Sequence, residues 1–203
     1  MSRTSNSQAD SHPVAQSLIQ EYFGQFEGQL TIDGLEVSEI VRRHGSPLYV
    51  YDSSILKRRW NDLRCALPDR FEIYYSMKAN PHLAFLDYFL SKNCGLEIAS
   101  GGELRQAIHA GCPADKILFA GPGKTEAELQ AALEQGVGEI HCESRLEADR
   151  IATISESMGI CTKIALRVNP ASEAQGGAMR MGGKPAPFGI DEEQLDHIVD
   201  HVR

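Results

Sequence analysis

The residue best placed to do chemistry in this sequence is Lys78, which lies within the segment YYSMKANP at positions 74–81. It directly follows an apolar run typical of a buried strand, and an Asn-Pro pair interrupts the chain two residues later. Lysine is seldom found at the end of a buried strand without a purpose, because burying an ammonium group is costly unless it is paired. A partly desolvated lysine at such a position suits an amine that forms a Schiff base. The alternative is a surface lysine whose stem packs along the strand end.

The elements that must position Lys78 form a regular alternation after Pro47. Short apolar or β-branched runs predict strands, and the stretches between them carry apolar residues at helical spacing. One helix between successive strands predicts βαβ units in a parallel sheet, so the expected fold class is α/β. Periodicity alone leaves a doubly wound sheet and a (β/α) barrel open. The predicted strands cover residues 48–51, 71–76, 95–100, 117–121, 139–144 and 163–169. The predicted helices cover residues 53–66, 81–92, 102–111, 125–135 and 145–158.

The two ends of the chain depart from this alternation. Residues 1–29 open with a Ser/Asn/Gln-rich stretch and are expected to be disordered or poorly ordered. Residues 30–46 contain LTIDGL, which predicts a strand or hairpin, and then a short helix at 37–44. A last helix is predicted at 191–203, and no glycine or proline cap follows it, so we expect the chain to be the front part of a longer domain. The apolar stripe of this helix consists of Leu195, Ile198, Val199 and Val202.

Composition excludes several classes of protein. The formal net charge is -8 and no run of lysine and arginine occurs, which argues against a nucleic-acid binder. Five cysteines are present without a C-x-x-C pair, a usage typical of reduced thiols in the cytoplasm. The start of the chain lacks the apolar core of a signal peptide, and no apolar stretch has the length of a membrane span. We therefore expect a cytoplasmic protein without nucleic-acid or membrane partners.

Two patterns imitate functional sites. GPGKT at 121–125 resembles the end of a phosphate-binding P-loop, but Leu118 occupies the position where that motif requires glycine. We interpret the segment as a strand-to-helix loop in which Thr125 caps the helix and Glu128 completes a capping box. His197 and His201 are four residues apart on the last predicted helix, and without a third ligand they do not predict a metal site.

Several segments resemble, in the same order, the motifs of one enzyme family. The resemblance is to the pyridoxal-phosphate decarboxylases of fold type III, the diaminopimelate/ornithine/arginine decarboxylase family, and it extends over residues 30–203 as the N-terminal portion of such an enzyme. The related alanine racemases have a tyrosine and glycines shortly after the lysine, whereas Lys78 is followed by Ala-Asn-Pro-His. The segments are HGSPLYVYD (44–52), YYSMKANP (74–81), GLEIASGGELRQAIHAG (95–111), GPGKTEAEL (121–129), CESRLEADRI (142–151), RVNP (167–170) and FGID (188–191).

The resemblance implies a fold and a set of site residues. Residues 47–203 would form the first part, about five of eight units, of a (β/α)8 TIM-type barrel, with residues 30–46 on the side of a β-domain whose C-terminal part is absent. Lys78 would form the Schiff base with pyridoxal 5'-phosphate. Glu97 stands where the family usually has aspartate near the cofactor, although a carboxylate bound to water or a neighbouring lysine is an alternative. Arg167 would belong to the network under the cofactor ring, or would be a structural ion-pair partner.

The implied function is decarboxylation of an amino acid by the full-length protein, which would be a homodimer. The loop at 176–191 resembles that of the butirosin glutamyl-[acyl-carrier-protein] decarboxylase and of the exosortase-associated decarboxylases, so the substrate is a free or a carrier-bound amino acid. Its glycines predict that residues 176–184 move and contact the far end of the substrate. The alternatives are a racemase of the same fold and a catalytically inactive fragment that binds the cofactor.

Overall fold

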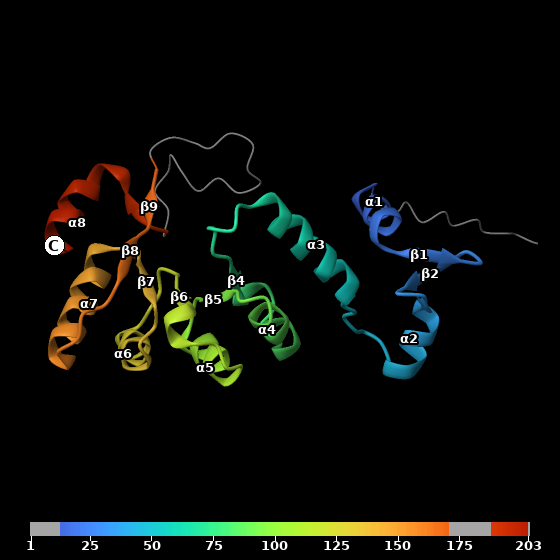
Figure 1. The fold of residues 1–203 in the computed structure, drawn as a ribbon, viewed down its shortest axis with the longest axis horizontal. Coiled ribbons are helices and arrows are strands. Elements are labelled where there is room, and N and C mark those ends of the chain that lie inside the picture. The colour runs from blue at the N-terminus through green and yellow to red at the C-terminus, as the bar shows by residue number, and fades with distance from the viewer. Residues whose placement is uncertain (1–12, 171–187, 203) are drawn as a thin grey trace, which may run out of the picture. The chain divides into compact units, whose positions relative to one another are not determined.

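The computed structural model describes residues 13–170 and 188–202 (Figure 1). The chain divides into two compact units, residues 1–71 and residues 72–203. This boundary lies later in the chain than the one at 46/47 that the sequence predicts.

From residue 13 onward, where its description begins, the first unit combines three helices with a small antiparallel sheet of order β1-β2-β3. The predicted hairpin is confirmed, because β2 and β3 pair around Asp33 and Gly34, both of which have positive φ. The elements of this unit are α1 (Pro13–Tyr22), β1 (Gly24–Phe26), β2 (Gln29–Ile32), β3 (Leu35–Glu36), α2 (Val37–His44) and α3 (Ser53–Ala66).

Two predictions for this unit differ from the structure. Residues 1–29 were expected to be poorly ordered, whereas α1 and β1 lie within that range. The strand predicted at 48–51 is wrong: the segment has no strand structure, and Tyr49 is 91% exposed. A short apolar run forms a strand only where a neighbouring strand accepts its hydrogen bonds, and the described residues provide none for this segment.

The second unit contains a parallel sheet of order β4-β5-β6-β7-β8, with α4 to α7 as the connections (Figure 1). Strands that are adjacent in the sequence are adjacent in the sheet throughout. A doubly wound sheet reverses its strand order at one point, so this order is that of a (β/α) barrel. The strands are β4 (Tyr74–Ser76), β5 (Gly95–Ile98), β6 (Ile117–Phe119), β7 (Glu139–Cys142) and β8 (Ile164–Leu166). The helices are α4 (Leu83–Leu90), α5 (Gly101–His109), α6 (Glu126–Gln135) and α7 (Arg145–Met158).

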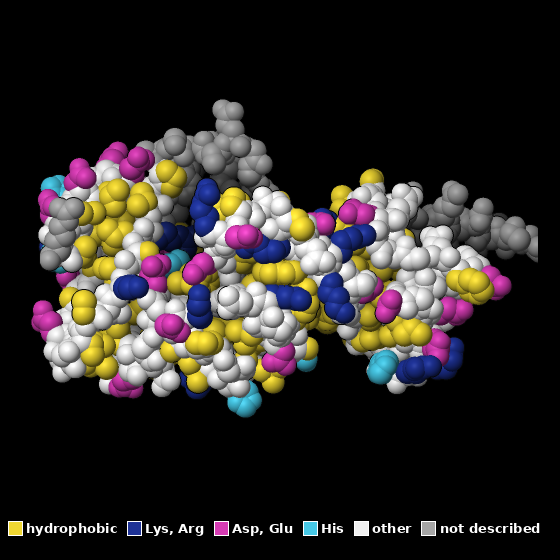
Figure 2. All heavy atoms as spheres, in the orientation of Figure 1, with side chains coloured by type: hydrophobic (Ala, Val, Ile, Leu, Met, Phe, Trp, Pro, Cys, Tyr) yellow, Lys and Arg dark blue, Asp and Glu magenta, His cyan; other side chains and the backbone are white. Residues whose placement is uncertain are grey.

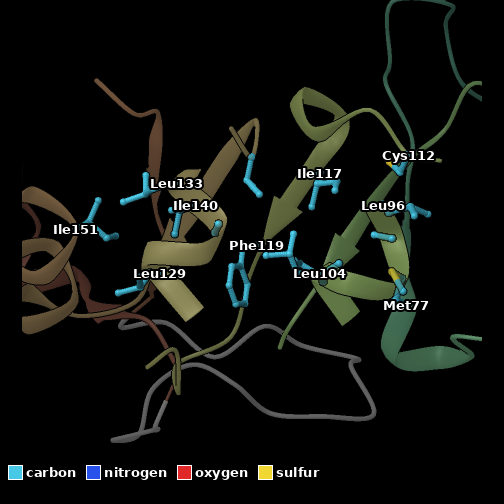
Figure 3. Close-up of a cluster of buried hydrophobic side chains, with 14 of the residues drawn as sticks. Met77, Leu96, Leu104, Cys112, Ile117, Phe119, Leu129, Leu133, Ile140 and Ile151 are labelled. Carbon is cyan, nitrogen blue, oxygen red and sulfur yellow. The ribbon is translucent and has the colours of Figure 1, made fainter. Parts of the chain in front are cut away.

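Side chains of alternate strand residues form the core between the sheet and its helices (Figure 3). Leu96 and Ile98 of β5 are buried, and Glu97 between them is less buried. Successive residues of a strand point to opposite faces, so Glu97 lies on the face away from the helices. The carboxylate of Glu97 therefore lies on the face that a barrel turns inward. Other members of the core are Met77, Leu86, Leu104, Ile117, Phe119, Leu129, Ile140, Cys142 and Ile151.

Polar caps begin the helices directly after the strands. The side chains of Ser100, Thr125 and Ser144 each accept a hydrogen bond from the backbone N–H three residues later. The capping box of Thr125 and Glu128 is confirmed. These caps end each loop within a few residues of its strand, so the loops stay short and the strand ends stay close to the helix N-termini.

Two short strands and a helix follow the five-stranded sheet. β9 (Val168–Asn169) and β10 (Ile190–Asp191) pair in parallel, and β10 leads through a 3-10 turn (Glu192–Gln194) into α8 (Leu195–Val202). Of the predicted apolar stripe on α8, Ile198 is buried at 3% exposure and Val202 is 37% exposed. Figure 2 shows hydrophobic side chains gathered on the visible surface over this region.

Candidate active site

Lys78 lies at the carboxyl end of β4, in a 3-10 turn (Met77–Ala79). Its Nζ is 3.8 Å from Oε1 of Glu97, and the two side chains are 69% and 26% exposed. Glu97 is on the neighbouring strand, where it lies opposite Ser76 in the register. The structure thus brings together two of the three predicted site residues, and it leaves the amine accessible from solvent.

The turn that carries Lys78 is held on both sides. The ring of Tyr75 stacks on Phe89 of α4 with centroids 4.0 Å apart, and its hydroxyl donates to the carbonyl oxygen of Asn80 at 3.0 Å. Met77 is fully buried in the core. Because these contacts hold the backbone on both sides of Lys78, the position of its Cα atom is fixed.

Arg167 directly follows β8, the outer strand on the side of the sheet opposite β4, and it lies at the carboxyl ends of the strands as Lys78 does. Its Nη1 donates to both carboxylate oxygens of Glu143, at 2.9 and 3.1 Å, and its guanidinium carbon lies 5.0 Å from the centroid of the Phe188 ring. The carboxylate of Glu143 is 1% exposed and the side chain of Arg167 is 34% exposed. The arginine thus forms an ion pair with Glu143, and part of its side chain still reaches the surface.

A buried cation accompanies this pair. Nζ of Lys124 donates to the carbonyl oxygens of Gly121 and His141, each at 2.7 Å, and to the carboxylate of Glu147 at 3.0 Å. The lysine side chain is completely buried. All three donor directions of the ammonium group are thereby used inside the protein. A P-loop lysine must reach a phosphate, so this geometry agrees with the interpretation of GPGKT as a structural loop.

Sequence reasoning missed Glu143 and Glu147. Glu147 accepts the backbone N–H of Glu143 at 2.7 Å as well as the ammonium group of Lys124, so the two carboxylates belong to one network. A signal for Glu143 was present in the sequence, because it stands near the end of a predicted strand, as Lys78 and Arg167 do. The signal for Glu147 was its place three residues after the helix cap Ser144.

The edge formed by these strand ends suits an anionic cofactor with an aldehyde group. Ligands of parallel α/β folds bind at the carboxyl ends of the strands, which is where Lys78, Glu97 and Arg167 lie. The buried hydroxyl of Ser76, two residues before Lys78, has no hydrogen-bond partner within the described part of the chain. An accessible amine, an unsatisfied hydroxyl and a fixed guanidinium group are therefore present on the same edge.

Three further features were considered in the sequence: a substrate loop, a metal site and a membrane span. The loop residues 176–184 lie outside the described residues. Among residues 13–170 and 188–202, no group of three or more His, Cys, Asp and Glu side chains could hold a metal ion. Within the same ranges, every helix is too short or too polar to cross a membrane.

Comparison with known proteins identifies the family. The family described as "Pyridoxal-dependent decarboxylase, pyridoxal binding domain" matches residues 53–203. The L-glutamyl-[BtrI acyl-carrier protein] decarboxylase of Niallia circulans is 35% identical over 174 residues, which cover 86% of this chain and 41% of that protein. The diaminopimelate decarboxylase of Aquifex aeolicus is 39% identical over 180 residues, covering 86% of this chain and 42% of that protein.

Solved structures agree with the sequence comparisons. The crystal structure of AQ1208 from Aquifex aeolicus matches with a TM-score of 0.78 and 32% identity over 92% of this chain and 43% of the other. The diaminopimelate decarboxylase of M. jannaschii in complex with L-lysine matches with a TM-score of 0.78 and 26% identity, over 90% and 44%. The predicted partial barrel is confirmed, and the chain spans about two-fifths of the length of the curated relatives it matches. The chain belongs to the pyridoxal-dependent decarboxylase family, whose pyridoxal-binding domain it matches from residue 53 to residue 203.

Proposed function

We propose that the full-length protein is a pyridoxal-phosphate-dependent amino-acid decarboxylase in which Lys78 binds the cofactor. The observation that carries the proposal is the position of Lys78 in a chain of this family. Its amine is exposed at the carboxyl end of β4 and lies 3.8 Å from the carboxylate of Glu97. The relatives named above are decarboxylases, which favours this reaction over the racemase alternative.

Three side chains of this chain would hold the cofactor: Lys78, Glu97 and Arg167. Pyridoxal phosphate supplies an electron sink that takes up the electron pair released when a carboxylate leaves as CO2. Nζ of Lys78 is the amine that the cofactor aldehyde requires, and when it is free it can hold or deliver a proton. Oε1 of Glu97 lies 3.8 Å from this Nζ and places a carboxylate beside the amine. The guanidinium group of Arg167 contributes positive charge at the same edge of the sheet.

The substrate is proposed to be an amino acid that is either free or bound to a carrier protein. This range follows the relatives, one of which is named for a glutamyl group on an acyl-carrier protein and another for diaminopimelate. We also propose that the full-length protein is a cytoplasmic homodimer.

The test is CO2 release by the purified full-length protein with pyridoxal phosphate. The panel includes diaminopimelate, glutamate, lysine, ornithine, arginine and a glutamyl carrier protein. We expect release from one of these, and a decrease of about a hundredfold or more in Lys78→Ala. Lys116→Ala is the matched control, because Lys116 pairs with Glu72 at the surface, away from the carboxyl ends of the strands. Inversion of the substrate without CO2 release, or full activity in Lys78→Ala, would contradict the proposal.

A further inference from the structure

We propose that Glu143 is a positioning residue, which fixes the guanidinium group of Arg167 so that it can hold the cofactor. The inference rests on the proposed function, in which Arg167 belongs to the cofactor site. It adds Glu143 as the residue that keeps the guanidinium group of Arg167 in position.

Glu143 is surrounded by donors. Its Oε1 accepts from the backbone N–H of Gly121 at 2.8 Å and from Nη1 of Arg167 at 2.9 Å. Its Oε2 accepts from Nη1 at 3.1 Å and from the backbone N–H of Gly189 at 3.1 Å. The side chain is 1% exposed, so it depends on these partners for the solvation that water would otherwise provide. The carboxylate thereby ties together the chain after β6, the chain after β8 and the chain before β10.

Arg167 is held from several directions. Its backbone N–H donates to Cys142 at 2.9 Å, and its carbonyl oxygen accepts from Ile190 at 2.8 Å. A Cβ atom added to Gly189 would lie 2.9 Å from that carbonyl oxygen, so the backbones approach more closely there than a side chain permits. The Phe188 ring covers the guanidinium group. The backbone is fixed by strand pairing, whereas the direction of the side chain depends on Glu143 and Phe188.

Charge and the number of acceptors distinguish glutamate from glutamine at this position. All four contacts of the carboxylate are with donors, and an amide replaces one acceptor oxygen by an NH2 group, which is itself a donor. Glu143→Gln would therefore set donor against donor at one of these contacts and remove the charge that attracts Nη1. We expect Arg167 to leave its present orientation while the backbone pairing of the strands is kept.

Glu128 provides a matched control. It too is a carboxylate at a strand-to-helix loop, and it accepts backbone N–H groups from Gly101 at 2.7 Å and Thr125 at 3.0 Å. It therefore also joins two loops of the carboxyl edge, but none of its contacts in the described residues is with Arg167. Glu128→Gln therefore measures the effect on cofactor binding of weakening the hydrogen bonds between two loops without any change at Arg167.

The experiment measures the dissociation constant of pyridoxal phosphate and its absorption spectrum in the full-length protein. The variants are Glu143→Gln, Glu128→Gln, Arg167→Met and the double variant of Glu143→Gln with Arg167→Met. We expect Glu143→Gln and Arg167→Met each to weaken cofactor binding about tenfold, the size of one lost charged hydrogen bond. The double variant should bind no more weakly than Arg167→Met, because Glu143 acts through the arginine. Glu128→Gln should lower the melting temperature and leave the dissociation constant within about twofold of the wild type.

Three results would overturn the inference. Equal dissociation constants for Glu143→Gln and Glu128→Gln, or additive losses in the double variant, would show that Glu143 does not act through Arg167. Full-length wild-type protein that binds no pyridoxal phosphate would overturn the proposed function and the inference with it. If Glu143→Gln does not fold, Glu143→Asp and Glu128→Asp replace the two glutamine variants. Glu143→Asp keeps the charge and loses reach, and it should weaken cofactor binding more than Glu128→Asp does.

Discussion

The ammonium group of Lys124 lies 3.0 Å from the carboxylate of Glu147, and the two side chains are 0% and 6% exposed. One lies in the loop after β6 and the other in the first turn of α7, so the pair joins two successive βα units. Through the backbone N–H of Glu143, the same pair supports the carboxylate that contacts Arg167. A buried structural ion pair thus lies directly beneath the proposed cofactor edge.

Removing the cation of this pair should destabilise the protein strongly. Lys124→Met leaves the buried carboxylate of Glu147 without its charge partner, which costs about 3–5 kcal/mol of unfolding free energy. Lys116→Met is the control, since Lys116 forms an exposed pair with Glu72 and its loss should cost less than about 1 kcal/mol. Urea unfolding followed by circular dichroism measures both. Equal small losses would show that the Lys124 pair contributes little.

Lys78 should carry the cofactor covalently. Borohydride reduction of the full-length protein loaded with pyridoxal phosphate makes the bond to the lysine permanent, and peptide mapping then locates the pyridoxyl group. We expect it on Lys78, because this amine is 69% exposed and lies at the carboxyl edge of the sheet. Lys124 should remain unlabelled, because its Nζ is bound to three internal acceptors. A label on another lysine would refute the assignment.

Cys112 should make stability fall at high pH. Burial raises the pKa of its thiol to about 11, above the ordinary value of 9.0. The folded state therefore favours the protonated thiol, so the stability that this contributes is present below pH 9 and is lost as the pH rises through about 11. The difference in unfolding free energy between wild type and Cys112→Ala should decrease over this interval. If the difference in unfolding free energy between the two proteins stays constant up to about pH 11, the pKa of the Cys112 thiol is not raised by folding.

A methyl group on Gly138 should disturb the start of β7. A Cβ atom there would lie 2.2 Å from the backbone oxygen of Asp115, which cannot move without shifting the preceding turn. We expect Gly138→Ala to lower the unfolding free energy by about 1–3 kcal/mol. At Gly123, a Cβ atom would meet nothing within 4 Å, so Gly123→Ala should be nearly neutral. Thermal unfolding of the two variants compares them, and equal melting temperatures would contradict the steric argument.

The sequence by itself determined the local parts of this protein. The helices predicted at 53–66 and 145–158 agree with α3 and α7, and the capping box of Thr125 and Glu128 is present. Helical periodicity and caps involve residues no more than about four positions apart, so a short stretch of sequence contains the whole signal. The place of Lys78 after β4 is equally local, because an apolar run and an Asn-Pro pair mark it.

Only the tertiary structure decided which strand ends meet. The ion pair of Glu143 and Arg167 joins residues 24 positions apart, and the burial of Lys124 depends on His141 of the neighbouring strand. The order of the sheet distinguished a barrel from a doubly wound fold. Residues 48–51 form no strand, and none of the strands in the described part of the chain pairs with them. A strand's hydrogen bonds and a buried charge's partners are both supplied by segments distant in the sequence, so the periodicity of one segment cannot reveal them.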